Sequence, residues 1–261
     1  MNVLHSTLKI TGPSLRLTAN LVPWDAEAFG FPVAQIYELE VIDSSLVMES
    51  YREFEQWMDA GGIRIVSCRL PHDRLRESIF LESRGFRFIE MVLHPTIEKL
   101  QSLNIASDDL VIVPALESDL PVMRDIAERA FGYERYHVDP RLDPGLGDVR
   151  YGRWVTNSLN HPRQCLLKVM KGGHIVALFI VESGENRSVY WYLTAIAPEW
   201  QGRGYGQRVW RAMLRHHQAE GQDSVMTTIS ARNVAVLNLY AKLGFRFLPP
   251  EMTFHWVREC G

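Results

Sequence analysis

Residues 195–210 read AIAPEWQGRGYGQRVW, and this stretch decides how the whole sequence is interpreted. The residues before it alternate as a strand over 189–196, and apolar residues after it recur at helical spacing as far as Gly221. The turn between the two, Gln201-Gly202-Arg203-Gly204-Tyr205-Gly206, is rich in glycine. Glycines let a backbone approach a ligand closely, and the N–H groups at a helix start converge on an anion. The pattern predicts a pyrophosphate-binding turn.

Taken alone, these six residues are equally consistent with a plain glycine turn that caps a helix. Their context narrows the choice. Residues 165–170, 175–181 and 189–196 read as an antiparallel meander with tight turns between the strands. A Rossmann fold places its glycine loop after the first strand of a parallel unit, and a phosphate-binding loop of the nucleotidase type requires Gly-Lys-Ser/Thr. Neither pattern is present.

The flanking segments add further elements of mixed type. Residues 109–115 predict a strand, a helix-start signal at Ser118 and Asp119 opens a helix to Phe131, and a short helix is expected over 151–159. Downstream, 225–230 predicts a strand and 233–243 an amphipathic helix closed by Gly244. Closing strands are expected over 245–257.

Strand, Pro198, Gln-x-x-Gly-x-Gly, helix, strand, Asn233, Tyr240 and the closure at 243–245 occur in an order that resembles the GNAT superfamily of N-acetyltransferases. The resemblance covers roughly residues 109–258. It implies an α/β fold with a mixed, largely antiparallel sheet flanked by helices. It also implies an enzyme that moves an acetyl group from acetyl-CoA to a primary amine by direct attack.

The resemblance assigns roles to individual residues. Strand residues matching Thr194, Ala195 and Ile196 would pair their backbone with the pantetheine arm of the cofactor. The turn would bind the pyrophosphate through Gln201, Gly202, Arg203, Gly204, Tyr205, Gly206 and Gln207. Asn233 would contact the cofactor arm, and Tyr240 would protonate the departing thiolate. Acyl transfer supports these roles, because its oxyanion needs aimed donors and its leaving sulfur benefits from a proton source.

The general base is where the sequence departs from the family pattern. Some members carry a glutamate five residues before the asparagine, where this chain has Thr228. A proton acceptor must then come from elsewhere or through water. The candidates are Glu182, Glu134, His137 and Asp139.

The acceptor side resembles acetyltransferases that act on sugar-nucleotide amines, through Trp24-Asp25, Phe29-Gly30-Phe31 and the loop from Tyr133 to Asp139. In such enzymes the amine sits on a deoxysugar attached to dTDP. Arg135 could then pair with a phosphate, and Tyr136 or Trp154 could stack on a ring. The alternative is that these residues only pack a loop against the rest of the protein.

An internal repeat indicates two related lobes. Residues 78–88 read SIFLESRGFRF and residues 237–247 read LNLYAKLGFRF, so that Leu81 corresponds to Tyr240. The first copy has no counterpart of the glycine-rich turn. We therefore expect a degenerate GNAT-like lobe over 1–105 and a catalytic domain over 106–261, joined by the polar segment 101–109.

Composition limits the remaining functions. The formal net charge of -3, without a basic cluster, argues against a nucleic-acid partner. Cys68, Cys165 and Cys260 lack metal-ligand or disulfide spacing, so that no metal is expected. No segment predicts a membrane span or a leader, which favours a cytoplasmic protein, and a homodimer is left open. Two other functions remain: acetylation of another small amine, antibiotic or peptide amine, and a non-catalytic CoA-binding module.

Overall fold

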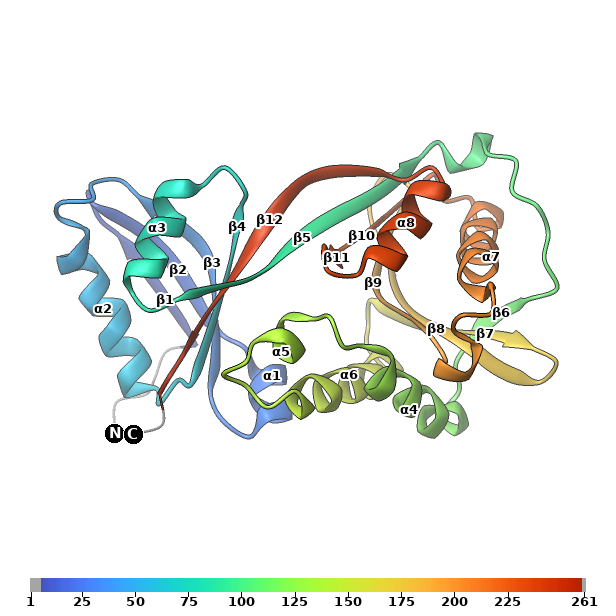
Figure 1. Ribbon diagram of the computed structural model, residues 1–261, viewed down its shortest axis with the longest axis horizontal. Coiled ribbons are helices and arrows are strands. Elements are labelled where there is room, and N and C mark those ends of the chain that lie inside the picture. The colour runs from blue at the N-terminus through green and yellow to red at the C-terminus, as the bar shows by residue number, and fades with distance from the viewer. Residues whose placement is uncertain (1–5, 260–261) are drawn as a thin grey trace. The chain divides into compact units, whose positions relative to one another are not determined.

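The computed structural model describes residues 6–259, which fall into two compact units. Unit 1 contains the chain up to Met91 and from Pro250 onward, and unit 2 contains Val92–Pro249. The division expected from the sequence, at residue 105, differs from this one. The strands β5 (Arg87–Glu98) and β12 (Arg246–Val257) each begin in one unit and end in the other (Figure 1). Contiguous segments therefore do not define the units.

Unit 1 has the strand order β1-β2-β3-β4-β12. The strands β3 and β4 pair in parallel, whereas the other neighbours are antiparallel. Besides its parts of β5 and β12, the unit contains β1 (Thr7–Thr11), β2 (Leu15–Leu21), α1 (Pro23–Phe29), β3 (Val33–Val41), α2 (Val47–Ala60), β4 (Ile65–Pro71) and α3 (Leu75–Ser83).

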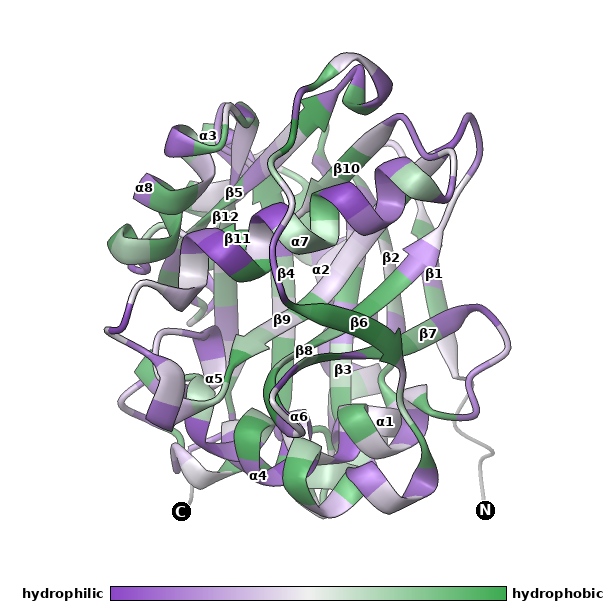
Figure 2. Cartoon of the chain, turned by 90° about the vertical axis from the view of Figure 1, so that its right-hand side faces the viewer, coloured by the Kyte–Doolittle hydropathy of each residue, from purple (hydrophilic) through white to green (hydrophobic). Residues whose placement is uncertain are grey.

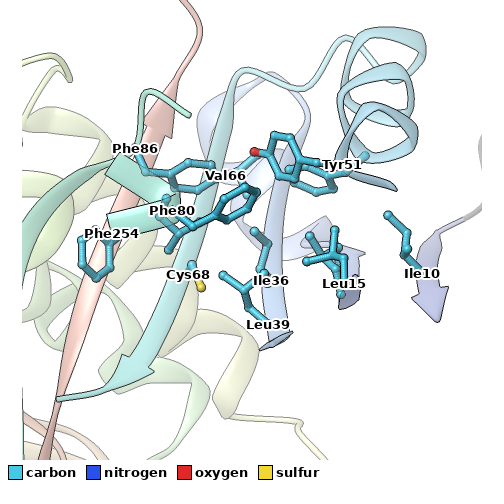
Figure 3. Packing of buried hydrophobic residues seen from close by; sticks show 14 of the residues in the cluster. Ile10, Leu15, Ile36, Leu39, Tyr51, Val66, Cys68, Phe80, Phe86 and Phe254 are labelled. Atoms are coloured by element: carbon cyan, nitrogen blue, oxygen red, sulfur yellow. The ribbon is translucent and has the colours of Figure 1, made fainter. Parts of the chain in front are cut away.

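The core of unit 1 lies between its helices and its sheet. One face of α2 is buried, with Tyr51 and Phe54 in its centre. The ring of Tyr51 meets the edge of Phe80 from α3 at a centroid distance of 5.0 Å. Figure 3 shows these rings above the aliphatic side chains of β2 and β3. Burial raises the pKa of the Cys68 thiol in this core.

Unit 2 has the strand order β5-β10-β9-β8-β7-β6, with β11 also paired to β5. The strands β9 and β10 pair in parallel, and the other pairs are antiparallel. Its remaining elements are η1 (Leu100–Ser102), β6 (Val111–Pro114), η2 (Glu117–Asp119), α4 (Leu120–Ala130), α5 (Arg135–Val138), α6 (Gly145–Ser158), β7 (Gln164–Lys171), β8 (His174–Ser183), β9 (Ser188–Ile196), η3 (Pro198–Trp200), α7 (Tyr205–Ala219), β10 (Ser224–Thr227), β11 (Ile229–Ser230) and α8 (Val234–Lys242).

Two apolar layers sandwich the sheet of unit 2. One layer joins it to α7 and α8, and the other joins it to α4 and α6 (Figure 1). In Figure 2 the outer surface of α7 is largely hydrophilic while β6 and β8 are apolar, as expected of an amphipathic helix on a buried sheet. The predicted α/β fold with a mixed, largely antiparallel sheet is confirmed. None of the helices within residues 6–259 is long and apolar enough to cross a bilayer.

One helix starts earlier than expected. The sequence predicts a helix over 151–159, but α6 begins at Gly145, where the Asp143 carboxylate accepts the Gly145 N–H at 2.9 Å. A side chain at Gly147 would meet the ring of His137, since an added Cβ would lie 2.3 Å from its Cε1. The close approach of the His137 ring to the backbone explains why residue 147 is a glycine. Glycine lowers the helix propensity of the segment but does not prevent the helix.

The two segments of the sequence repeat also have the same backbone conformation where their helices end. Gly85 follows α3 with a φ of 83°, and Gly244 follows α8 with a φ of 86°. The Phe86 N–H donates to Leu81 at 3.1 Å, and the Phe245 N–H donates to Tyr240 at 3.0 Å. Both helices therefore end in the same left-handed glycine cap and lead directly into a strand.

Candidate active site in unit 2

A β-bulge in β9 rearranges its side chains. Leu193 pairs with Ile180 and Trp191 with Val181, which leaves Tyr192 as an extra residue. The extra residue reverses the alternation of faces. Trp191 packs in the layer with α7, whereas Leu193 packs in the layer with α4 and α6.

The same strand has an open edge beyond the bulge. The parallel pairing of β10 with β9 ends at Thr227 and Trp191, where the Thr227 hydroxyl donates to the Trp191 carbonyl at 2.8 Å. From Tyr192 to Ile196, no strand of the described part of the chain pairs with β9 on this side. The Gln201 amide donates to the Ile196 carbonyl at 2.9 Å, at the far end of the gap. Such an edge can pair with an extended chain that carries amide groups.

The glycine-rich turn follows this edge at once. Gly202 and Gly204 have φ values of 70° and 79°, and Gly204 is the N-cap of α7. An added Cβ at either glycine would meet nothing within 4 Å. The N–H groups of the first helical turn have no intrahelical acceptors, and the helix dipole makes this end positive. The exposed Arg203 beside them lines a surface hollow of about 520 Å³ together with Trp200 and Glu199.

A second arginine near the turn is neutralised. Arg208 donates to Asp108 at 2.9 and 2.7 Å and to Asp109 at 2.5 Å. The guanidinium, aided by the Asp109 hydrogen bonds, lowers the pKa of Asp108 to about 2. The segment 101–109, expected to be a linker, is thus fixed to α7 through Asp108 and Asp109. The groups of the turn that remain available to an anion are its backbone N–H groups and Arg203, whereas Arg208 is already paired.

Tyr240 lies in the last turn of α8 and is only 1% exposed. Burial raises the pKa of its phenol, while the nearby Trp210, Thr227 and Thr194 side chains act in the opposite direction. Within residues 6–259, no acceptor has hydrogen-bond geometry to the indole N–H of Trp210, although this group lies close enough to favour the phenolate. Thr194 and Thr227 belong to the two strands that part here, so the hydroxyl lies where the open edge begins.

Asn233 is the N-cap of α8, and its side-chain oxygen accepts the Val236 N–H at 3.3 Å. Cap residues of this kind fix where a helix begins. Asn233 thereby holds the helix that carries Tyr240.

The acceptor candidates lie near one another on α5 and α6. Tyr136 is 1% exposed, its ring lies 4.7 Å from the Arg135 guanidinium, and Arg135 donates to its hydroxyl at 3.1 Å. Trp154 donates to Gln164 at 3.3 Å and lies 6.1 Å from the ring of Tyr192. Sequence reasoning missed Arg150, whose guanidinium lies 5.2 Å from the Trp154 ring and 5.5 Å from that of Tyr136.

Three of the four base candidates are held by charged partners. Asp139 is buried and accepts two hydrogen bonds from Arg141, at 2.9 and 2.8 Å. Glu182 forms an ion pair with Arg163. His137 Nε2 lies 3.1 Å from Asp148. The fourth candidate, Glu134, precedes α5, and its carbonyl caps that short helix by accepting from His137 at 2.8 Å.

A different titratable residue lies beside Thr228. His94 of β5 places Nδ1 at 3.4 Å from the Thr228 hydroxyl, and the Tyr190 hydroxyl is hydrogen-bonded to the same oxygen. The sequence contains no signal for this group, because β5 reaches β11 only through sheet pairing.

His216, His217 and Glu220 could together face a metal ion at the end of α7. However, His217 Nε2 accepts the Trp191 indole N–H at 3.0 Å, so Nδ1 carries the proton of the neutral ring. Burial lowers the pKa of His217 to about 4. The buried imidazole therefore connects α7 to β9 and is poorly disposed to ligate a metal.

The open edge, the turn and the buried phenol all lie within a region that is similar to a known family. Residues 120–245 match the acetyltransferase (GNAT) family. The chain carries a GNAT acetyltransferase domain. Members of this family use acetyl-CoA as the acyl donor, so that acetyltransferase chemistry and its cosubstrate are confirmed at the level of the family.

Two curated relatives show where the similarity lies. The dTDP-fucosamine acetyltransferase of Escherichia coli O6:H1 is 25% identical over 197 residues, which cover 74% of this chain and 80% of that protein. The mycothiol acetyltransferase of Frankia casuarinae is 36% identical over 67 residues, or 26% of this chain. The matched part is 20% of that relative's length.

Solved structures share the fold at low identity. A GCN5-related N-acetyltransferase from Sphaerobacter thermophilus has a TM-score of 0.65 at 13% identity, covering 96% of this chain and 82% of that one. A tandem GNAT protein from the clavulanic acid biosynthesis pathway has a TM-score of 0.58 at 14% identity, covering 95% and 80%.

Proposed function

We propose that this protein transfers the acetyl group of acetyl-CoA to a primary amine by direct attack. The single observation that carries the proposal is that the Tyr240 hydroxyl lies near the side chains of Thr194 and Thr227, at the start of the open edge of β9. A thioester held along that edge has a proton donor at its sulfur and backbone N–H groups beside its carbonyl. Acyl transfer requires both.

The cofactor would occupy two adjoining features. The pantetheine amides pair with the backbone of Thr194, Ala195 and Ile196, which no strand occupies among the described residues. The pyrophosphate lies on the turn from Gln201 to Gln207, where Gly202 and Gly204 keep the approach free of side chains. Asn233 contributes by fixing α8, and with it Tyr240.

Tyr240 would act as the general acid. Because burial raises its pKa, the phenol keeps its proton at neutral pH and can donate it to the departing thiolate. The indole N–H of Trp210 then finds its acceptor in the phenolate. A buried donor to which the described residues offer no acceptor is unusual in a folded protein and is consistent with such a role.

The acceptor would be the amine of a nucleotide-linked amino deoxysugar. Two observations support this class: the similarity to dTDP-fucosamine acetyltransferase along most of the chain, and the guanidinium and aromatic groups of α5 and α6. Arginines suit phosphates, and aromatic faces suit sugar and base rings. Because the Tyr136 ring is buried beneath two guanidinium groups, we assign it to holding Arg135 and Arg150, and stacking to Trp154.

The two lobes would have separate tasks. In this proposal a catalytic domain over 106–261 carries the CoA chemistry and a degenerate GNAT-like lobe occupies 1–105, except that the chain from Pro250 onward packs with unit 1. A second candidate acceptor is another small amine, favoured by the local similarity to mycothiol acetyltransferases.

The test is release of free thiol from acetyl-CoA by the purified chain with a panel of amines. The panel contains dTDP-4-amino-4,6-dideoxygalactose, glucosamine, an aminoglycoside and a peptide with a free amine. Turnover with the first compound alone supports the sugar-nucleotide assignment, and turnover with another amine selects the second candidate. Acetyl-CoA binding without turnover on any amine would instead identify a non-catalytic module.

A further inference from the structure

Thr228 interrupts the strand expected over 225–230 and separates β10 from β11. Successive side chains of an extended segment point to opposite faces. The Thr227 side chain lies near the Tyr240 hydroxyl, in the layer with α7 and α8. Thr228 therefore points to the other face, where its hydroxyl meets Tyr190 and His94.

These groups are close to the reacting atoms. Tyr190 lies one residue before Trp191, the last residue of β9 that pairs with β10. A negative charge on the Tyr190 phenol would raise the pKa of Tyr240, so the two phenols are close enough to interact electrostatically across the sheet. An acetyl group bound at the open edge would therefore have Tyr240 on one face of the sheet and the Tyr190-Thr228 pair on the other.

Direct transfer of the acetyl group to an amine requires a proton donor for the departing thiolate and a proton acceptor for the incoming ammonium. The thiolate departs toward the acid while the amine approaches from the opposite side, and an amine that arrives as an ammonium must first lose a proton. An imidazole is the side chain best suited to accept a proton near neutral pH. Asp139 and Glu182 are instead ion-paired with arginines, and His137 is directed at Asp148.

We propose that His94 is the terminal proton acceptor of the reaction, reached from the substrate through Tyr190 and Thr228. The proposal rests on the acetyl transfer proposed above. The ammonium gives a proton to the Tyr190 oxygen, Tyr190 passes its own to Thr228, and Thr228 passes its own to His94 Nδ1. His94 becomes an imidazolium, and the substrate becomes a neutral amine.

The remaining protons also balance. The amine nitrogen attacks the thioester carbon, and the C–S bond breaks as the tetrahedral intermediate collapses. Tyr240 protonates the sulfur and regains a proton from the acylated nitrogen, while His94 releases its proton to solvent. The products are an amide, the CoA thiol and one proton, as an ammonium substrate requires.

The test compares two nucleophiles. The first is the panel amine that the unmodified protein acetylates, which reaches the enzyme as an ammonium. The second is hydroxylamine, which is largely neutral at the pH of the assay and needs no base. We expect His94→Gln and Thr228→Val to lower kcat/KM for the ammonium by about 10²-fold, the typical size of a base contribution, with little change for hydroxylamine. His72→Asn, an exposed histidine of unit 1, is the matched control and should change neither rate.

The outcomes separate this proposal from the one on which it rests. Equal losses with both nucleophiles, or full activity of His94→Gln with the ammonium, would overturn the role of His94 while leaving acetyl transfer intact. No thiol release by the unmodified protein would overturn both. Calorimetric binding of acetyl-CoA to each variant shows whether the fold and cofactor site survive the substitution, and we expect it to be unchanged.

Discussion

At the scale of single residues, the phenol of Tyr240 is set up to stay protonated. Burial raises its pKa, so the acid form persists through the neutral range and is lost only above the ordinary phenol value, near pH ~10. We expect Tyr240→Phe to lower kcat by about 10²-fold and to leave the KM for acetyl-CoA nearly unchanged. Steady-state kinetics between neutral and alkaline pH check this. Full activity of the variant at every pH would contradict an acid role.

Gly204 shows how a single backbone angle serves binding. Its φ of 79° lies in the left-handed region, where a side chain costs about 1 kcal/mol. Gly204→Ala should therefore lose stability and also raise the KM for acetyl-CoA by about tenfold, since its Cβ projects into the space of the pyrophosphate; tenfold corresponds to about 1.4 kcal/mol. Gly221 has a φ of 81° and equally open surroundings at the other end of α7. Gly221→Ala should lose similar stability without any change in KM, as thermal unfolding and kinetics can show.

At the scale of elements, α7 and β9 are joined by the hydrogen bond from the Trp191 indole to His217 Nε2. This bond requires a neutral imidazole, and burial lowers the pKa of His217 to about 4. The unfolded chain takes up this proton near pH 6.5 and the folded chain only near pH 4, so stability is lost as the pH falls between these values. We expect the free energy of unfolding in urea to fall by about 1–2 kcal/mol from pH 7 to pH 5.

The matched variant for this pH dependence is His217→Gln. Its amide oxygen can accept the Trp191 N–H but does not titrate. The variant should have lower stability at pH 7, because a flexible amide replaces a packed ring, together with a flatter pH dependence. An unchanged slope would mean that another histidine carries the effect.

The elements also show which features a sequence can predict. Helical spacing identified α7 and α8, and the glycine-rich turn was placed correctly between β9 and α7 because both neighbours are strongly patterned. The bulge at Tyr192 could not be predicted, since one extra residue leaves the strand apolar on average and changes only which face each side chain occupies. His94 was missed because it meets Thr228 through the pairing of β5 with β11, which no local pattern encodes.

At the scale of the whole molecule, the two units share more than their helix caps. Thr18 of β2 pairs with Glu38 of β3, and Ala19 pairs with Ile36, which leaves Tyr37 as an extra residue in β3, as Tyr192 is in β9. The parallel pairing of β3 with β4 ends at Ile36, just before this bulge, as the pairing of β9 ends at Trp191. The strands β3 and β9 each place the bulge at their fifth residue. Unit 1 thus retains the open edge without the glycine turn, which supports its assignment as a degenerate copy.

In unit 1, side chains of the protein itself satisfy backbone groups of β3 beyond the bulge. The Val41 N–H donates to the buried Glu77 carboxylate at 3.1 Å, and Arg76 donates to the Val41 carbonyl at 3.2 Å. Both side chains come from α3, the counterpart of α8, and they satisfy backbone groups of the kind that a pantetheine arm would pair with in unit 2. The turn before α2 contains Asp43, whose carboxylate accepts from Ser45 at 2.8 and 2.6 Å. These hydrogen bonds lower the pKa of Asp43, so a negative charge lies where a pyrophosphate would bind.

This arrangement predicts one acetyl-CoA per chain in spite of the repeat. Calorimetric titration of the full chain should give a single site, and Gly204→Val should abolish it without revealing a second, weaker one. Glu77→Ala removes the side chain that fills the unit 1 edge but leaves Asp43 in the turn, so we expect lower stability and no new binding site. A second site in the unmodified protein, or one that survives Gly204→Val, would mean that unit 1 binds the cofactor. The two copies would then be equivalent in function, and acetyl-CoA would displace the Glu77 and Arg76 side chains from the Val41 backbone when it binds to unit 1.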